Sequence, residues 1–546
     1  MMDTKEILKF CVERGLLLDP EVLGLFSESA DDESVKLMID RIQRYTQKRI
    51  ITKDILETNK ERVSEFFLGL PKENQAKLEN LKIKLGLQIE ISKESAVISG
   101  QPESEFVIAG QNIPGMQDED DAKVIVLSKN PSFRKKIEVD DFVKSMRNRI
   151  FEMKEMLQEH PDLENLISIN KLSRARQRVS IIGMVSDKRV TKNRNIMLEV
   201  EDLTGKIKVL VSQGKEDLYK KAEDISMDSV LGFTGFGDRE IFFANDVIFP
   251  DAFLSERKHS PFEESALFIG DIHYGSKLFM EESFMRLVDY MNGKGGKPAE
   301  AEKIKYLFIN GDLVAGIGVY PNQQKDLKVG DLEAQFHGLA EILSKIRRSI
   351  RIIISPGNHD GVRLMEPQPM LDEKYAWPLY NMKNVTLAGN PAYINVGQGK
   401  NFSGFNVLSY HGGSYPFYAN NVPSLVKKAL NEPEKIMAYL LKNRHLAPTY
   451  SSTQMFPSEK DELVIKKIPD IFVSGHIHKC AVTYYNNVLI VSGAGWEEET
   501  EYQKRKGISL DYCKVPMFNL KTREIKILDF DIKEEHEKLM HKEVKS

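Results

Sequence analysis

Five apolar runs in the second half of the sequence each lead into residues that could bind a metal ion. The runs are "ALFIG", "KYLFIN", "RIIISPG", "FNVLSY" and "DIFVSG", and the residues that follow them are, in order, Asp271 and His273, Asp312, Asn358 with His359 and Asp360, His411, and His476 with His478. A glycine that permits a tight turn accompanies each group, namely Gly270, Gly311, Gly357, Gly412 and Gly475. One such exit is an ordinary turn or helix cap, but five in order indicate a shared site.

The side chains in these groups suit divalent metal ions. Carboxylates, a carboxamide oxygen and neutral imidazoles bind Mn²⁺, Fe²⁺ or Zn²⁺, and no cysteine thiolate stands among them to compete. Two metal ions about 3.5–4 Å apart need a bridging carboxylate with further ligands on each side. The predicted ligands are Asp271, His273, Asp312, Asn358, His411, His476 and His478. We therefore predict a site for two divalent ions, with Mn²⁺ as the first choice and Fe²⁺, Zn²⁺ or Mg²⁺ as alternatives.

The stretch "PGNHDG" places three polar residues in a row after the third apolar run. We expect Asn358 to offer its side-chain oxygen to one metal ion, which leaves His359 free to act on a substrate. The sequence leaves two interpretations of Asp360 open, because this carboxylate could orient His359 or cap the segment that follows.

From about residue 262 onward, apolar strands alternate with helical stretches. This alternation predicts an α/β core with helices on both faces of the sheets. In open α/β sheets, ligands gather beyond the carboxyl ends of the strands, which is where the five polar groups fall. We assign residues 256–535 to this domain and residues 536–546 to a charged tail.

The preceding segments follow other patterns, so that the expected fold class is multidomain α/β. Residues 1–70 have apolar residues at helical spacing and predict a small helical domain, whereas residues 71–140, rich in Gly, Pro, Ser and acidic residues, predict a flexible linker. A charged connecting helix is expected within residues 141–175, ending near Pro161. In residues 176–255, alternating strands, a helical insert near 215–224 and the turn "DLTG" suit a five-stranded barrel of the OB type.

Two segments have candidate contacts to a substrate. OB barrels often bind single strands through basic residues and aromatics, and this barrel supplies Lys188, Arg189, Lys192, Arg194, Lys206 and Lys208. A barrel that docks onto another protein is the alternative. The insertion at residues 414–452 contains Tyr415, Phe417, Tyr418, Lys427, Lys428, Lys442, Arg444 and His445. Packing of a helical hairpin is the expectation for this insertion, and contact with substrate is the alternative hypothesis.

Bulk properties narrow the class of protein. A chain of 546 residues has room for two to four domains, and its formal net charge of −4 provides no global basic field for nucleic acid. The three cysteines, Cys11, Cys480 and Cys513, are far apart, which fits a reducing compartment and excludes a zinc site built from cysteines. The N-terminus lacks a signal-peptide layout, and no window approaches the roughly 18 apolar residues of a membrane span. We therefore expect a cytoplasmic protein without membrane contact.

The motifs Asp-x-His, Gly-Asp, Gly-Asn-His-Asp, His-Gly and Gly-His-x-His resemble those of the calcineurin-like metallophosphoesterases. The resemblance implies a layered β-sandwich flanked by helices, with two metal ions and with His359 as the acid that protonates the leaving oxygen. It assigns to the first ion Asp271, His273, Asp312 and His478, and to the second ion Asp312 as the bridge with Asn358, His411 and His476. One departure is "GDLVAG", where many members have a further acidic or polar residue and this chain has Leu313 and Val314.

The order of helical domain, linker, barrel and phosphoesterase domain resembles the small subunits of archaeal family-D DNA polymerases. The stretches "FIGDIHYGSK", "INGDLVAG", "PGNHDGVR", "LSYHGGS" and "SGHIHK" support this resemblance, which covers roughly residues 170–515. It implies a partner, the large catalytic polymerase subunit, in which polymerisation resides. The related eukaryotic subunits have a broken ligand set, whereas the intact set here implies a working 3′→5′ exonuclease that releases nucleoside 5′-monophosphates from single-stranded DNA 3′ ends. The alternatives are a phosphomonoesterase of the same superfamily and a non-catalytic scaffold subunit.

Overall fold

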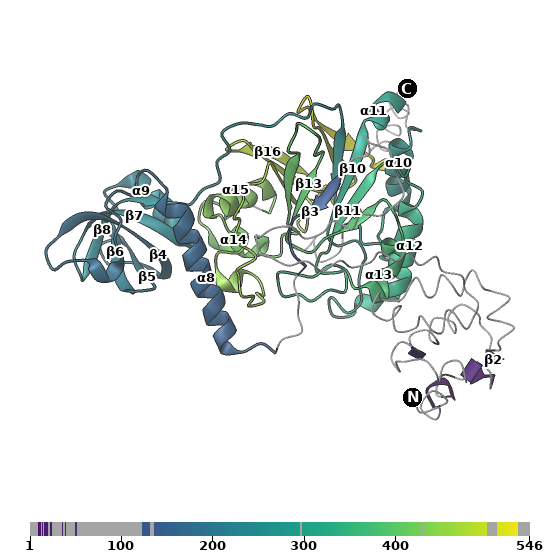
Figure 1. The fold of residues 1–546 in the computed structure, drawn as a ribbon, viewed down its shortest axis with the longest axis horizontal. Helices are drawn as coiled ribbons and strands as arrows, with labels where there is room; N and C mark the ends of the chain where they lie inside the picture. Colours follow the sequence, from purple (N-terminus) through teal and green to yellow (C-terminus); the bar gives the residue numbers. More distant parts are fainter. Residues whose placement is uncertain are drawn as a thin grey trace, which may run out of the picture. The chain divides into compact units, whose positions relative to one another are not determined.

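A computed structural model of the chain describes residues 123–130, 136–294, 297–426, 430–499 and 510–532, with scattered positions between 9 and 51 (Figure 1). The chain divides into two compact units, Met1–Ile108 with Asp372–Lys383 and Ala109–Leu371 with Asn384–Ser546. Most of the predicted linker, the predicted tail 536–546, Lys427 and Lys428 lie outside the described residues. None of the helices in the described ranges is long and apolar enough to cross a membrane.

The first unit contains short elements only within its described positions. Strand β1 (Leu17–Leu18) pairs in parallel with β2 (Ile50–Ile51), and α13 (Glu373–Tyr380) belongs to the same unit. Residues 9–12, 22–23, 35–36 and 39 are helical. The predicted helical domain at residues 1–70 lies mostly outside the described positions and stays a prediction, to which the structure adds a strand pair that the sequence pattern did not indicate.

The second unit begins with a helix and a closed barrel. Helix α8 (Val139–Gln158) ends shortly before Pro161, as predicted, and is followed by the short η1 (Ile169–Lys171). The barrel strands are β4 (Gln177–Val190), β5 (Ile196–Asp202), β6 (Gly205–Val211), β7 (Val230–Gly237) and β8 (Ile241–Ile248), which close in the order β4-β5-β6-β8-β7 (Figure 1). Helix α9 (Glu216–Glu223) joins β6 to β7 where the helical insert was predicted.

Local sequence explains the barrel's turns and its interior. In the "DLTG" turn, Asp202 Oδ1 accepts hydrogen bonds from the backbone N–H groups of Thr204 and Gly205 at 2.7 and 3.0 Å, so that the carboxylate stabilises the turn between β5 and β6. Along β5, Ile196, Leu198 and Val200 are fully buried, because alternate residues of a strand point to the same face. The apolar face of α8 then covers the barrel with Ile150, Met153 and Leu157, packed against Ile182, Met184, Val230 and Ile248.

Two six-stranded sheets form the rest of this unit. The first has the order β12 (Val385–Leu387), β11 (Arg351–Ser355), β10 (Ile304–Asn310), β9 (Ser265–Ile269), β18 (Lys514–Asn519) and β19 (Ile525–Asp529), with β9 to β12 parallel. The second has the order β16 (Ala481–Tyr485), β17 (Val488–Ser492), β15 (Ile471–Ser474), β14 (Phe405–Ser409), β13 (Ala392–Val396) and β3 (Val124–Val126), with β14, β15 and β17 parallel.

Strand β3 corrects the prediction of a flexible linker at residues 71–140. The three residues "VIV" pair antiparallel with β13 in the register Val126↔Ile394 and Val124↔Val396. A run of three apolar residues is too short for its period to identify a strand from sequence. Its conformation depends on the backbone hydrogen bonds that the edge of β13 offers, which only the tertiary structure provides.

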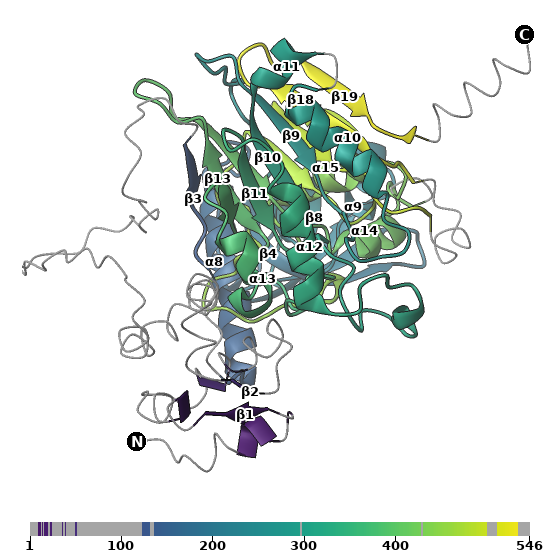
Figure 2. The same cartoon turned by 90° about the vertical axis from the view of Figure 1, so that its right-hand side faces the viewer.

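The main core lies between the two sheets, and helices cover the outer faces. The shared core contains Phe268, Phe308 and Ile353 from the first sheet and Val407, Val473 and Val491 from the second. Helices α10 (Glu281–Met291) and α12 (Leu332–Leu343) lie over the first sheet, with α11 (Pro298–Glu302) near its end (Figure 2). Helices α14 (Tyr415–Asn421) and α15 (Pro433–Asn443) cover the second sheet.

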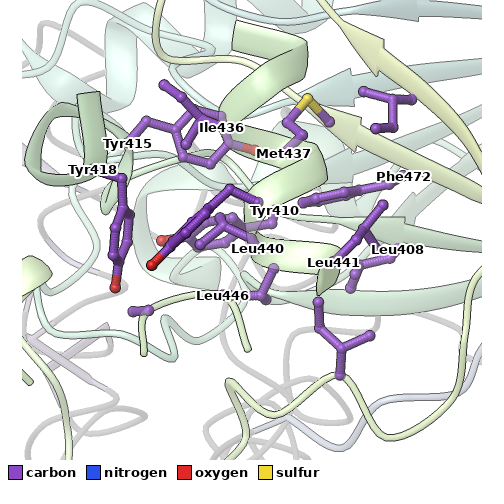
Figure 3. Packing of buried hydrophobic residues seen from close by; sticks show 14 of the residues in the cluster. Leu408, Tyr410, Tyr415, Tyr418, Ile436, Met437, Leu440, Leu441, Leu446 and Phe472 are labelled. Atoms are coloured by element: carbon purple, nitrogen blue, oxygen red, sulfur yellow. The ribbon is translucent and has the colours of Figure 1, made fainter. Parts of the chain in front are cut away.

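Over its described residues, 414–426 and 430–452, the insertion contains two packed helices, α14 and α15. Tyr415 and Tyr418 are 0% exposed and belong to one buried cluster with Leu440 of α15 and Phe472 of β15 (Figure 3). His445 is also buried. The hypothesis that these aromatic and basic residues contact substrate is therefore wrong for Tyr415, Tyr418 and His445, because the sheet face beneath them requires an apolar cover.

Candidate metal centre

The predicted ligands converge where the strands end. All five apolar runs are buried strands, namely β9, β10, β11, β14 and β15. One ligand atom each from Asp271, His273 and His478 lies within 4.8 Å of the others, and the same holds for Asp312, His411 and His476. His273, Asp312 and His359 form a third such group, so that the two clusters adjoin.

Asp312 lies between the two clusters. Its Oδ2 is 3.3 Å from His411 Nε2 and 3.9 Å from both His273 Nε2 and His359 Nε2. Its Oδ1 accepts a hydrogen bond from the backbone N–H of His359 at 2.8 Å. The backbone therefore holds one carboxylate oxygen while the other faces imidazoles from both sides.

Several nitrogen and oxygen atoms that could ligate a metal ion lie close to one another. His273 Nε2 lies 3.2 Å from His478 Nε2, and His476 Nδ1 lies 3.3 Å from His411 Nε2. Asn358 Oδ1 is 3.2 Å from the same His411 nitrogen. Lone pairs of neutral imidazoles repel at such distances unless a proton or a metal ion lies between them. The donor set thus fits the two predicted divalent ions, and its imidazole, carboxylate and amide ligands match Mn²⁺, Fe²⁺ or Zn²⁺.

The backbone at the centre is strained. The residues with positive φ, between 49° and 70°, include Asp271, His273, Asp312, His476 and His478. A non-glycine residue in the left-handed region costs about 1–3 kcal/mol, and such residues concentrate at functional sites. The tight turns after the strands impose this conformation, which the sequence pattern did not reveal.

Neighbouring groups orient the imidazole of His411. Its Nδ1–H donates to the backbone carbonyl of Asn310 at 3.1 Å, so that Nε2 faces the centre. A Cβ at Gly311 would lie 2.1 Å from His411 Nδ1, and one at Gly357 would lie 2.3 Å from Asp312 Oδ1. Both glycines are therefore required by close approach. Asn310 was missed by sequence reasoning, although a polar residue that ends an apolar strand is a usable signal.

The structure gives Asp360 a role that differs from both interpretations of the sequence. Its carboxylate accepts hydrogen bonds from the backbone N–H groups of Gly357 at 2.7 Å and Val314 at 3.1 Å. Asp360 therefore ties the turn that precedes it to the loop after β10, which is neither of the expected roles. The ring of His359 is oriented instead by the backbone carbonyl of Ala315, 2.8 Å from its Nδ1.

Burial and charge set the protonation of the ligands. Burial lowers the pKa of His476 to about 3 and that of His478 to about 4, so both are neutral at pH 7, as metal ligation requires. Burial alone would also lower the pKa of His411, but the Asp312 carboxylate raises it to about 10. Burial raises the pKa of Asp271 well above its usual range. A cation that binds here must therefore displace protons.

Exposure identifies the open side of the centre. Asp271, His273, Asp312 and His411 are at most 3% exposed. The side chain of His359 is 18% exposed, and Asn358 and His476 are half-buried. The side of the centre that faces solvent is therefore the side with His359, Asn358 and His476.

Comparisons with known proteins agree with the fold and the motifs. The family model for calcineurin-like phosphoesterases matches residues 265–480. The DNA polymerase II small subunit of Pyrococcus furiosus is 37% identical over 402 residues, which cover 72% of this chain and 64% of that protein, so the match spans less than two thirds of the relative. The DNA polymerase II small subunit of Methanothermobacter thermautotrophicus is 35% identical over 397 residues, which cover 72% of this chain and 80% of the relative. The chain therefore belongs to the family of archaeal family-D DNA polymerase II small subunits, with a calcineurin-like phosphoesterase domain in its C-terminal half.

Proposed function

We propose that this chain is a two-metal 3′→5′ exonuclease that removes nucleoside 5′-monophosphates from single-stranded DNA 3′ ends during DNA replication. The observation that supports this most directly is the Asp312 carboxylate, which lies within 3.9 Å of imidazoles from both clusters. A scaffold subunit would have no need to keep five strained or buried ligands around one carboxylate.

The ligands divide into two sets in this proposal. Asp271, His273, Asp312 and His478 would hold the first ion, and Asp312, Asn358, His411 and His476 would hold the second. The groups Asp271–His273–His478 and Asp312–His411–His476 of ligand atoms support this division. When bound, such ions lower the pKa of water and offset the charge that develops on the phosphate. Mn²⁺ is the proposed metal.

His359 acts as the general acid. Its Nδ1–H is held by the Ala315 carbonyl, so that Nε2 faces the centre, 3.9 Å from Asp312 Oδ2, and the imidazolium form carries its transferable proton on that nitrogen. That proton passes to the departing 3′ oxygen of the shortened strand. An imidazole suits the task near pH 7, and general acids of this kind contribute about 10²–10⁴-fold in rate.

The barrel is proposed to be of the OB type and to guide the strand. Its strand order and the helix between β6 and β7 suit that assignment. Two of the six basic residues predicted to bind DNA contact other residues of this chain. Lys206 pairs with Glu201 at 2.6 Å, and Lys188 donates to the Ile225 carbonyl at 2.9 Å. The exposed cations that remain for phosphates are Arg189, Lys192, Arg194 and Lys208.

The large catalytic subunit of the polymerase is the proposed partner, and polymerisation is assigned to it. The relatives' designation as small subunits supports this assembly. The exonuclease would then serve as a proofreading activity for strands made by the partner.

The first test is a metal-dependent assay on the isolated chain and on the chain with its partner. A 5′-labelled single-stranded oligonucleotide with Mn²⁺ should be shortened from its 3′ end with release of 5′-mononucleotides. Faster action on a small aryl phosphomonoester would favour the phosphomonoesterase, and no hydrolysis of either substrate would leave the scaffold role.

Two variants test the assigned residues. Asp312→Asn is expected to lose both metal ions together, because its carboxylate is shared, and calorimetry that still finds two bound Mn²⁺ would contradict the bridging role. His359→Ala is expected to keep metal binding and lose about 10²–10⁴-fold in turnover. Cleavage of a DNA 3′ end at the wild-type rate would show that His359 is not the acid.

A further inference from the structure

We infer that Gln323, which lies outside the metal centre, positions His359 for proton transfer through the backbone carbonyl of Ala315. This inference rests on the proposed function, because it concerns the acid of that reaction. Within the described residues, the one hydrogen bond of the His359 ring is from Nδ1 to Ala315 O, at 2.8 Å. A carbonyl can only accept, so Nδ1 carries a hydrogen and Nε2 is directed to the centre.

Gln323 holds that carbonyl in place. Its Nε2 donates to Ala315 O at 2.8 Å, and its Oε1 accepts from the backbone N–H of Val319 at 2.9 Å. The N–H of Ala315 itself donates to the Tyr274 carbonyl at 2.9 Å. The two lone pairs of Ala315 O are thus used by Gln323 and His359, and rotation of the peptide would break both bonds.

The adjoining peptide leaves the loop little freedom. Gln335 in α12 is 0% exposed, and its Oε1 accepts from the N–H of Gly316 at 2.9 Å. Gly316 has φ of +72°, and a Cβ there would lie 2.2 Å from the carbonyl oxygen of His359. Leu313 and Val314 are apolar and fully buried, so this loop meets the His359 ring with backbone and not with a polar side chain.

The effect of Gln323 should appear in turnover and not in binding. Gln323 is 1% exposed and therefore does not contact a substrate. Without it, the Ala315 carbonyl can turn away, and His359 then samples orientations in which Nε2 no longer faces the leaving oxygen. The metal ligands keep their own hydrogen bonds.

The test compares Gln323→Leu with Gln324→Leu, a matched control at the exposed neighbouring glutamine. With Mn²⁺ and single-stranded DNA, we expect the kcat of Gln323→Leu to fall about tenfold, while KM and the affinity for Mn²⁺ stay unchanged. This decrease is smaller than the decrease that follows removal of a general acid, because His359 is still present. Gln324→Leu should match the wild type. Thymidine 5′-(p-nitrophenyl phosphate), whose leaving group needs no proton, should be hydrolysed by Gln323→Leu within about twofold of wild type.

Two further measurements separate positioning from general damage. The double variant His359→Ala with Gln323→Leu should be no slower than His359→Ala, because Gln323 acts only through His359. Histidine ¹⁵N NMR of the metal-free chain should show the Nδ1–H tautomer of His359 in Gln324→Leu and a mixture of tautomers in Gln323→Leu. If Gln323→Leu does not fold, judged by its melting temperature, Gln323→Met replaces it.

The outcomes distinguish this inference from the proposed function. A wild type that hydrolyses neither substrate overturns both. A wild type that degrades DNA, beside a Gln323→Leu variant with unchanged kcat, overturns only the role of Gln323. Equal losses on both substrates, or additive effects in the double variant, would likewise show that Gln323 does not act through His359.

Discussion

Replacement of Arg149 by methionine should destabilise the second unit by about 3 kcal/mol, because it leaves a buried carboxylate without its cation. Arg149, in α8, is 1% exposed, and its Nε donates to Asp461 Oδ2 at 2.7 Å. Its other nitrogens contact the Pro448 carbonyl at 2.5 Å and Met455 Sδ at 3.4 Å. The predicted connecting helix is therefore joined to the phosphoesterase domain by a buried ion pair.

The magnitude follows from what remains around Asp461. Loss of one partner from a buried ion pair costs about 3–5 kcal/mol. Asp461 keeps His445 Nε2 at 3.0 Å and the N–H of Leu463 at 3.1 Å, which argues for the lower end of that range. The combination Arg149→Met with Asp461→Asn should be less destabilised than the sum of the single changes, because the unpaired charge is then gone.

The assay is urea unfolding followed by circular dichroism. Arg147→Met is the matched control, since Arg147 lies on the exposed side of α8 and its replacement should change the free energy of unfolding by less than about 0.5 kcal/mol. A free energy of unfolding for Arg149→Met equal to that of Arg147→Met would refute the reasoning, as would strict additivity in the double variant.

Three other perturbations have defined outcomes. Gly357→Ala should abolish Mn²⁺ binding in calorimetry, since its Cβ would lie 2.3 Å from Asp312 Oδ1, whereas Gly330→Ala, with open space around it, should bind normally. Burial, with the nearby charge of Arg149, lowers the pKa of His445 to about 4. As the pH falls, the unfolded chain therefore binds a proton at His445 before the folded chain does, and the free energy of unfolding should fall by about 3 kcal/mol between pH 6.5 and 4. His445→Gln should reduce this dependence of the free energy of unfolding on pH. Because the Asp312 carboxylate raises the pKa of His411 to about 10, Mn²⁺ binding should release protons and strengthen as pH rises, and a binding enthalpy independent of buffer ionisation would contradict this.

The sequence by itself predicted most of the side chains that gather at the candidate metal centre. Each predicted ligand follows an apolar run, and parallel strands such as β9, β10 and β11 end at one edge of their sheet, so the order of motifs was sufficient to place Asp271, Asp312 and Asn358 at that edge. The barrel's strands, α9 and the end of α8 were likewise predictable, because alternation, a charged amphipathic stretch and a proline are local signals.

Only the tertiary structure decided how those residues are held. Strand β3 forms because β13 offers an edge, the insertion after His411 packs because the second sheet needs an apolar cover, and Asp360 binds two backbone amides that lie 43 residues apart in sequence (Val314 and Gly357). The positive φ angles at Asp271 and His476 and the carbonyl of Ala315 beside His359 have no sequence signature. Such features depend on distances between segments that fold far apart in the chain, and side-chain types report local preference but not those distances.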